Sequence, residues 1–330
     1  MLQVRISGTL CYNRATAELA RGPNIERDFR EKSGLQIRRL AGSKMFDPKA
    51  KRTNSVPASG ASVSSNGAIG QRIAKTKRLG EILFQTPGAW ADRAEKQKRI
   101  ADKVLSRSKV MRGANFQKIS REDLELMAYT YDELFLDGMA LSIAESFGLS
   151  FRLSSRMTRA GGKTTRTIFP ASAGKPARIH FEIAISTSLL FQSFRPGDGA
   201  IRVCGYDCLD RLTAMQRIVE HELLHLCEML VWNQSDCAAN RFQSIARNMF
   251  RHTEFRHELV TQQERAAKQF NVKTGNRVAF RYQGKVLTGI VNRITRRATV
   301  LVEDPRGERF SNGKTYVKYY VPIHALKAIS

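Results

Sequence analysis

The sequence predicts a mixed α+β fold, in which helices dominate the centre of the chain and short strands dominate its end. Two changes of periodicity indicate this class. Apolar residues recur at helical spacing from about residue 210 to residue 231, whereas residues 149–186 alternate between apolar and polar positions. Residues 271–330 return to the two-residue alternation, in short runs that turn residues separate. A Ser/Gly-rich stretch at residues 53–67 has the composition of a linker and sets the N-terminal region apart.

The charge of the chain is strongly positive and unevenly spread. Its 330 residues include 55 Lys and Arg against 30 Asp and Glu, a formal net charge of +25. Residues 1–115 carry roughly +15, residues 116–270 roughly +1 and residues 271–330 roughly +9. Basic side chains that neutralise phosphates release counterions, so two basic flanks predict contact with nucleic acid, and we expect DNA. The alternatives are a solvated basic surface and an N-terminus that directs import into an organelle.

Composition excludes several classes of protein. Hydrophobic residues make up 42% of the chain, enough for a folded core. No run of 18 apolar residues occurs, so we expect no membrane contact, and the N-terminus does not read as a secretory signal. The five cysteines are odd in number and scattered, which indicates a reducing compartment. We therefore expect a cytoplasmic protein associated with the nucleoid or chromatin, with organelle targeting as the alternative.

The N-terminal region, residues 1–115, is predicted to be basic and mostly disordered or helical. Residues 1–70 show no clear period, so we expect them to be largely disordered. Residues 71–112 mix Lys, Arg and Ala in the pattern of one or two basic amphipathic helices.

The central region, residues 116–270, begins with a predicted helix at residues 122–148. Ser120 is a good N-cap before acidic residues, and Gly148 has the position of a C′ residue. Strands are predicted next at residues 149–159, 163–169 and 177–186, the first two forming a hairpin that turns at residues 160–162. Further helices are predicted at about residues 210–231, 238–250 and 254–270.

The C-terminal region, residues 271–330, is predicted to be a small β-barrel of SH3-like or KOW-like type. Four or five short strands in so few residues favour such a barrel. Basic and aromatic residues alternate along these strands, which is typical of a nucleic-acid-binding surface. We expect Phe280 to fill the core of the barrel. Tyr319 and Tyr320 are adjacent, so one of them faces outward.

The predicted helix at 210–231 contains His221-Glu-Leu-Leu-His225, the pattern H-E-x-x-H. Residues four apart lie on one face of a helix, so both imidazoles can reach one metal ion. Zinc accepts nitrogen ligands in tetrahedral geometry, and a catalytic zinc keeps one position for water. Glu222 lies beside the first ligand, where its carboxylate can take a proton from that water. The motif therefore predicts a Zn²⁺ site with Glu222 as general base.

The third ligand has three candidates. We favour His252, which lies between two predicted helices at a position suited to a ligand. Cys237, twelve residues after His225, and His257 are the alternatives.

The central region resembles the SprT-like zinc metalloproteases, the group that includes the Spartan proteases. The resemblance covers about residues 130–270 and keeps the order of the elements. It begins at Tyr131-Asp-Glu-Leu and continues through the predicted hairpin at residues 151–166. It then follows the strand at residues 179–190 and the motif-bearing helix at residues 219–230.

The resemblance implies an α+β zincin-like core with zinc on His221 and His225. It also implies that Glu222 activates a zinc-bound water and that the enzyme cleaves proteins attached to DNA, as in the repair of DNA–protein crosslinks. Two departures are present. The family supplies its third ligand from a His-Gly motif soon after the helix, where this chain has Ala238, and His252 follows an extra helix. The C-terminal zinc ribbon of many members is missing, and the predicted barrel stands in its place.

Two other functions compete with a zinc metalloendopeptidase. The chain is alternatively a non-catalytic nucleic-acid-binding protein with a structural zinc site, which a fourth protein ligand in place of water would indicate. An RNA- or ribosome-associated factor fits the basic regions but leaves the H-E-x-x-H motif unexplained.

Overall fold

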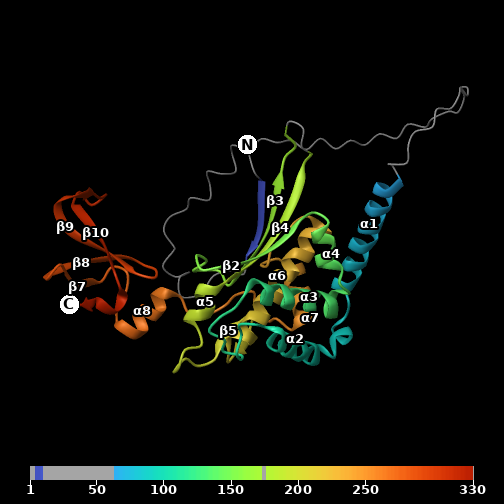
Figure 1. Cartoon of the computed structure of the whole chain (residues 1–330), viewed down its shortest axis with the longest axis horizontal. Coiled ribbons are helices and arrows are strands. Elements are labelled where there is room, and N and C mark those ends of the chain that lie inside the picture. Colours follow the sequence, from blue (N-terminus) through green and yellow to red (C-terminus); the bar gives the residue numbers. More distant parts are fainter. Residues whose placement is uncertain (1–3, 10–62, 173–175, 330) are drawn as a thin grey trace, which may run out of the picture.

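The computed structural model describes residues 4–9, 63–172 and 176–329, so the predictions for residues 10–62 lie outside the described residues. The fold is a mixed α+β one, as predicted. A larger part holds a four-stranded sheet and most of the helices, and a second sheet lies beside it at the C-terminal end (Figure 1). The elements of the larger part are β1 (Val4–Thr9), α1 (Val63–Leu83), η2 (Pro87–Trp90), α2 (Arg93–Arg107), α3 (Arg121–Leu136), α4 (Met139–Glu145), β2 (Leu149–Ser154), β3 (Gly162–Phe169), β4 (Arg178–Ser186), α5 (Thr187–Gln192), β5 (Ile201–Val203), β6 (Tyr206–Cys208), α6 (Arg211–Trp232) and α7 (Asn240–Phe250).

The helix predicted at residues 122–148 is divided into α3 and α4. Ser120 caps α3 as predicted, and its hydroxyl accepts the N–H of Asp123 in a capping box. The break follows from two residues in the left-handed region, Asp137 with φ 52° and Gly138 with φ 69°. A helix cannot continue through two such residues, so the chain starts a new helix at Met139.

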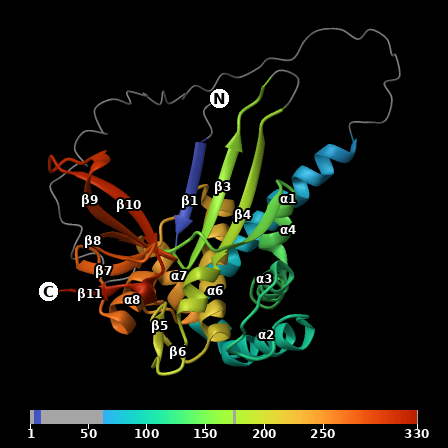
Figure 2. The ribbon, with the colours of Figure 1, turned by 60° about the vertical axis from the view of Figure 1, so that its left-hand side comes forward.

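The four-stranded sheet has the order β1-β3-β4-β2. β3 is antiparallel to both neighbours, whereas β2 pairs with β4 in parallel. The predicted hairpin is therefore wrong, because β4 lies between the two strands that it would join. Figure 2 shows β1, β3 and β4 side by side in this order. Ile183, Ala184 and Ile185 of β4 are consecutive buried residues, so this strand is covered on both faces and takes a central position. The strand β1 was not predicted.

Helix α6 runs through the hydrophobic core. Asp210 caps it by accepting the N–H of Thr213, and nearly every residue from Arg211 to Met229 is buried. The core around it includes Leu79 of α1 and Ile100 of α2. These two helices, predicted as part of the N-terminal region, thus share one core with the central region.

The C-terminal elements are α8 (Gln262–Phe270), β7 (Arg277–Tyr282), β8 (Lys285–Ile294), β9 (Ala298–Arg309), β10 (Thr315–Val321), η3 (Ile323–Ala325) and β11 (Lys327–Ala328). The five strands form an antiparallel sheet in the order β10-β9-β8-β7-β11, with its own core. Its edge strands β10 and β11 are not paired with each other, so the sheet is open where a closed barrel was predicted. Phe280 is buried in this core, as predicted, and Tyr319 packs against it.

An ion pair joins the C-terminal helix α8 to the larger part. Nη2 and Nη1 of Arg265 donate to the two carboxylate oxygens of Asp198, at 2.6 and 3.0 Å, and Nζ of Lys268 lies 3.5 Å from one of these oxygens. The Asp198 side chain is only 5% exposed. Its hydrogen bond to Arg265 is the main reason that the pKa of Asp198 falls to about 2.

This pair predicts a loss of stability in acid. The folded-state pKa of about 2 lies below the ordinary value of 3.8, so the stabilisation is complete above pH about 4 and disappears as the pH falls toward about 2. The difference corresponds to about 2 kcal/mol. Urea unfolding of the protein and of Asp198→Asn across this range measures it. We expect the gap between the two free energies of unfolding to close as the pH falls; a constant gap would contradict the assignment.

Across the described parts of the chain, no helix combines the length and the apolar character that crossing a membrane requires.

Candidate metal centre

The two histidines of the H-E-x-x-H motif face each other in the middle of α6. Their Nε2 atoms are 3.0 Å apart, and both side chains are completely buried. Two nitrogens bound to one tetrahedral zinc at about 2.0–2.1 Å would be about 3.3 Å apart. Burial is the main cause that lowers the pKa of His221 well below its ordinary value, followed by the neighbouring His225. His221 is therefore neutral, as a metal ligand must be.

A chain of hydrogen bonds fixes the proton of His225 on the nitrogen that points away from His221. Ser235 Oγ lies 2.7 Å from His225 Nδ1 and donates to Glu228 Oε2, also at 2.7 Å. Because the hydroxyl has a single proton, it must accept the Nδ1–H of the imidazole. Arg241 in turn holds the other oxygen of Glu228 at 2.7 Å. The Nε2 lone pair of His225 is thus directed at His221, as in a metal-ligating histidine with an outer partner.

Cys204 fixes the proton of His221 on the Nδ1 nitrogen in a similar way. Its Sγ is 3.7 Å from the carbonyl oxygen of Arg217 and 3.9 Å from Nδ1 of His221. The thiol donates to the carbonyl, which leaves the sulfur to accept the Nδ1–H. Both Nε2 atoms then present lone pairs to one another, an arrangement that a cation between them stabilises.

Cys237 brings a third donor to this point. One ligand atom from each of His221, His225 and Cys237 lies within 4.8 Å of the other two, and all three residues are buried. The helix α6 ends at Trp232, and the C-cap residue Asn233, with φ 59°, turns the chain back toward the histidines. The ring of Phe242 on α7 covers both imidazoles, with centroids 4.8 and 4.6 Å away. These buried His and Cys groups could hold a metal ion, and their donor chemistry fits zinc.

His252 and His257 lie in other surroundings. His252 Nε2 is 2.9 Å from Glu220 Oε2, and this histidine groups with Cys204 and His221 but not with His225. His257 Nε2 accepts the backbone N–H of Gly161 at 2.9 Å. Of the three candidates for a third ligand, Cys237 is the one that the structure brings to both motif histidines.

Glu222 lies between α6 and the start of β3. Thr164 Oγ1 is 2.8 Å from Glu222 Oε2, and both side chains are completely buried. A Cβ at Gly162 would come within 2.5 Å of Glu222 Oε1, so only glycine leaves room for the carboxylate here. The start of β3 thus fixes the position of the Glu222 side chain.

Sequence reasoning missed the outer partners of the centre. Glu228 lies three residues after His225 on the same helix face, and this spacing could have indicated it. Ser235, Cys204 and Thr164 come from separate segments, so no spacing in the sequence connects them to the motif.

Comparisons with protein-family models, with curated protein sequences and with solved structures find no match for this chain.

Proposed function

We propose that the protein is a zinc-dependent metalloendopeptidase that acts on proteins associated with DNA. The observation that carries this proposal is the meeting of one ligand atom from each of His221, His225 and Cys237, on the helix that also bears Glu222. The sequence resemblance to the SprT-like proteases over about residues 130–270 supports the same function, as does the α+β architecture around the motif helix.

In this proposal the protein residues hold the metal and move one proton. His221, His225 and Cys237 would hold the zinc ion, which when bound would polarise a peptide carbonyl and lower the pKa of a water molecule. Glu222 takes the proton of the attacking water and passes it to the leaving amine. Thr164 holds Oε2 of Glu222, and Gly162 leaves the space in which the carboxylate lies.

The expectation that the protein acts on DNA rests on charge and on one face of the C-terminal sheet. Tyr320 is 64% exposed and lies on the other face of the sheet from Tyr319. On the neighbouring strands, Tyr320 pairs with Thr299, and Thr299 pairs in turn with Arg293. Within the described chain, Arg277, Arg281 and Arg293 of this sheet take part in no ion pair. An aromatic ring among unpaired cations is the combination that binds nucleic acid by stacking and by phosphate contacts.

The burial of the centre favours one alternative, a structural zinc site in a non-catalytic nucleic-acid-binding protein. His221, Glu222 and His225 are all 0% exposed, and structural zinc sites are closed by protein ligands. Catalysis requires a substrate path to the metal, so the two functions differ in whether the zinc keeps a position for water.

The test is cleavage of a DNA-binding protein by the purified full chain loaded with zinc. We expect cleavage that a chelator abolishes, that DNA increases, and that Glu222→Gln lowers by roughly 10²- to 10⁴-fold, the usual contribution of a general base. Glu133→Gln is the control, because it alters a carboxylate that pairs with Lys103 on the surface, outside the metal centre.

Full zinc occupancy without cleavage under any condition would reject the peptidase and support the structural site. Cleavage that survives Glu222→Gln would reject Glu222 as the base.

A further inference from the structure

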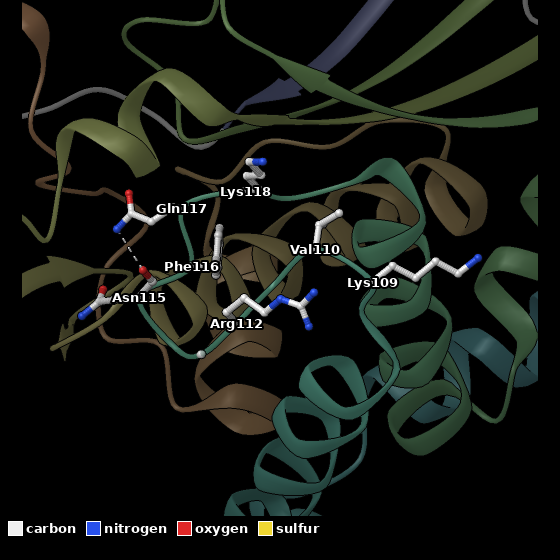
Figure 3. Close-up of a pocket in the computed structure, with 8 residues that line it drawn as sticks. Lys109, Val110, Arg112, Asn115, Phe116, Gln117 and Lys118 are labelled. Carbon is white, nitrogen blue, oxygen red and sulfur yellow. Dashed lines mark hydrogen bonds between the residues drawn. The ribbon is translucent and has the colours of Figure 1, made fainter.

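A pocket of about 580 Å³ lies in the segment that connects α2 to α3. Three cationic side chains, Lys109, Arg112 and Lys118, are among its lining residues (Figure 3). The connecting chain folds back on itself, and the figure draws Arg112 and Lys118 on either side of Phe116. Gly113, with φ 151°, adopts a backbone conformation that other residues rarely take, which permits this fold-back.

The three residues are exposed, and none of them lies within 4.0 Å of a carboxylate in the described residues, although Lys109 is close enough to Glu122 to help the hydrogen bonds of that carboxyl lower its pKa. By contrast, Lys98 and Lys103 on α2 and Arg121 on α3 are each within 4.0 Å of a carboxylate. The cations of the pocket are therefore available to an anion from outside.

The segment is held rigidly on the first turn of α6. Phe116 is buried against Phe191, at 6.1 Å between ring centroids. The buried Arg211 donates to the carbonyl oxygens of Asn115 and Phe116 at 3.0 and 3.1 Å. Two backbone groups complete the attachment: Leu212 N–H donates to Ala114 O, and Arg211 N–H to the Asn115 side chain. A ligand in the pocket would thus be fixed relative to the metal helix.

We infer that this pocket binds the phosphodiester backbone of DNA through Lys109, Arg112 and Lys118. The inference deepens the proposed function and rests on it for DNA as the polyanion. His221 lies ten residues after Arg211 on α6, about 15 Å along the helix axis. DNA held in the pocket would place a protein bound to that DNA within reach of the metal centre.

The test is the binding of a fluorescent DNA duplex of about 20 base pairs, with a single strand of the same sequence as a second arm. The Glu222→Gln protein is used throughout, so that binding is measured without cleavage and does not depend on the peptidase. The variant carries Lys109→Gln, Arg112→Gln and Lys118→Gln. The matched control carries Lys98→Gln, Lys103→Gln and Arg121→Gln, which removes the same charge from ion-paired positions nearby.

We expect the pocket variant to weaken binding roughly 10- to 100-fold at about 150 mM salt and to lower the salt slope for the duplex by about 2 to 3, the value for three lost phosphate contacts. The control should change the dissociation constant less than about threefold. An equal loss in both variants, or no loss in either, would overturn the inference.

Inorganic pyrophosphate serves as a competing probe for a free phosphate. If the pocket binds the phosphodiester backbone of DNA, we expect pyrophosphate to displace DNA only at millimolar concentrations. Tight binding of pyrophosphate that the pocket variant abolishes, with DNA binding unchanged, would assign the pocket to a free phosphate compound and reject DNA.

Discussion

Replacing Cys237 by Ala is expected to lower the zinc affinity of the protein on the order of a hundredfold or more. Structural zinc sites gain roughly 10–16 kcal/mol from about four ligands, so the loss of one ligand costs a few kcal/mol. Cys237 is the donor that lies within 4.8 Å of the ligand atoms of both motif histidines. Competition with a chromophoric chelator measures the affinity directly, without any assay of activity.

Two further variants make this measurement decisive. Cys208→Ala alters a different buried cysteine that belongs to neither candidate group and should leave the affinity unchanged. His252→Gln keeps a hydrogen-bond donor toward Glu220 and should change the affinity less than about tenfold, because His252 does not group with His225. A large loss in His252→Gln with little loss in Cys237→Ala would instead support the ligand favoured from the sequence.

Replacing Glu220 by Ala is expected to destabilise the fold by about 3–5 kcal/mol, the cost of removing one partner from a buried ion pair. Glu220 is completely buried and joins separate segments. Its Oε1 accepts from Tyr131 on α3 and Gln97 on α2, at 2.7 and 2.8 Å. Its Oε2 is 3.0 Å from Arg217 and 2.9 Å from His252. The charge of Arg217 and the bond from His252 hold the pKa of Glu220 below its usual value in spite of burial, so the carboxylate is charged.

Urea unfolding in the presence of a chelator measures this effect without a contribution from bound metal. Glu133→Ala is the matched control: Glu133 pairs with Lys103 on the surface, where its side chain is 67% exposed, and we expect a change within about 1 kcal/mol. If Glu220→Ala is no more destabilising than Glu133→Ala, the buried network does not contribute to stability in the way that its geometry indicates.

The sequence predicted the elements that have a strong local pattern. Helix α6 begins and ends within one residue of the predicted bounds, because its apolar stripe and the Asp210 cap are both local signals. The strands β3 and β4 were placed equally well. The order of the strands in the sheet was not predicted. The short link between β2 and β3 suggests a hairpin, whereas the central place of β4 depends on burial of both its faces.

In the candidate site, too, local spacing predicted one part and tertiary packing determined the rest. The spacing of His221 and His225 predicted that they would face one point, since four residues make about one helical turn. The choice between His252 and Cys237 depended on how the chain returns after α6. Asn233 in the left-handed conformation determines that return, and single residues of this kind carry little sequence signal. Ser235 and Thr164 reach the site through tertiary packing alone.

The pairing of β1 with β3 has a consequence for how the chain folds. Val4 pairs with Ile168, so forming this part of the sheet closes a loop of roughly 160 residues. Such non-local contacts form late and slow the folding reaction. Until β1 arrives, β3 presents an open edge with unpaired backbone groups, which is a site for association between chains. The strand that positions Glu222 therefore depends, during folding, on the most distant pairing partner in its sheet.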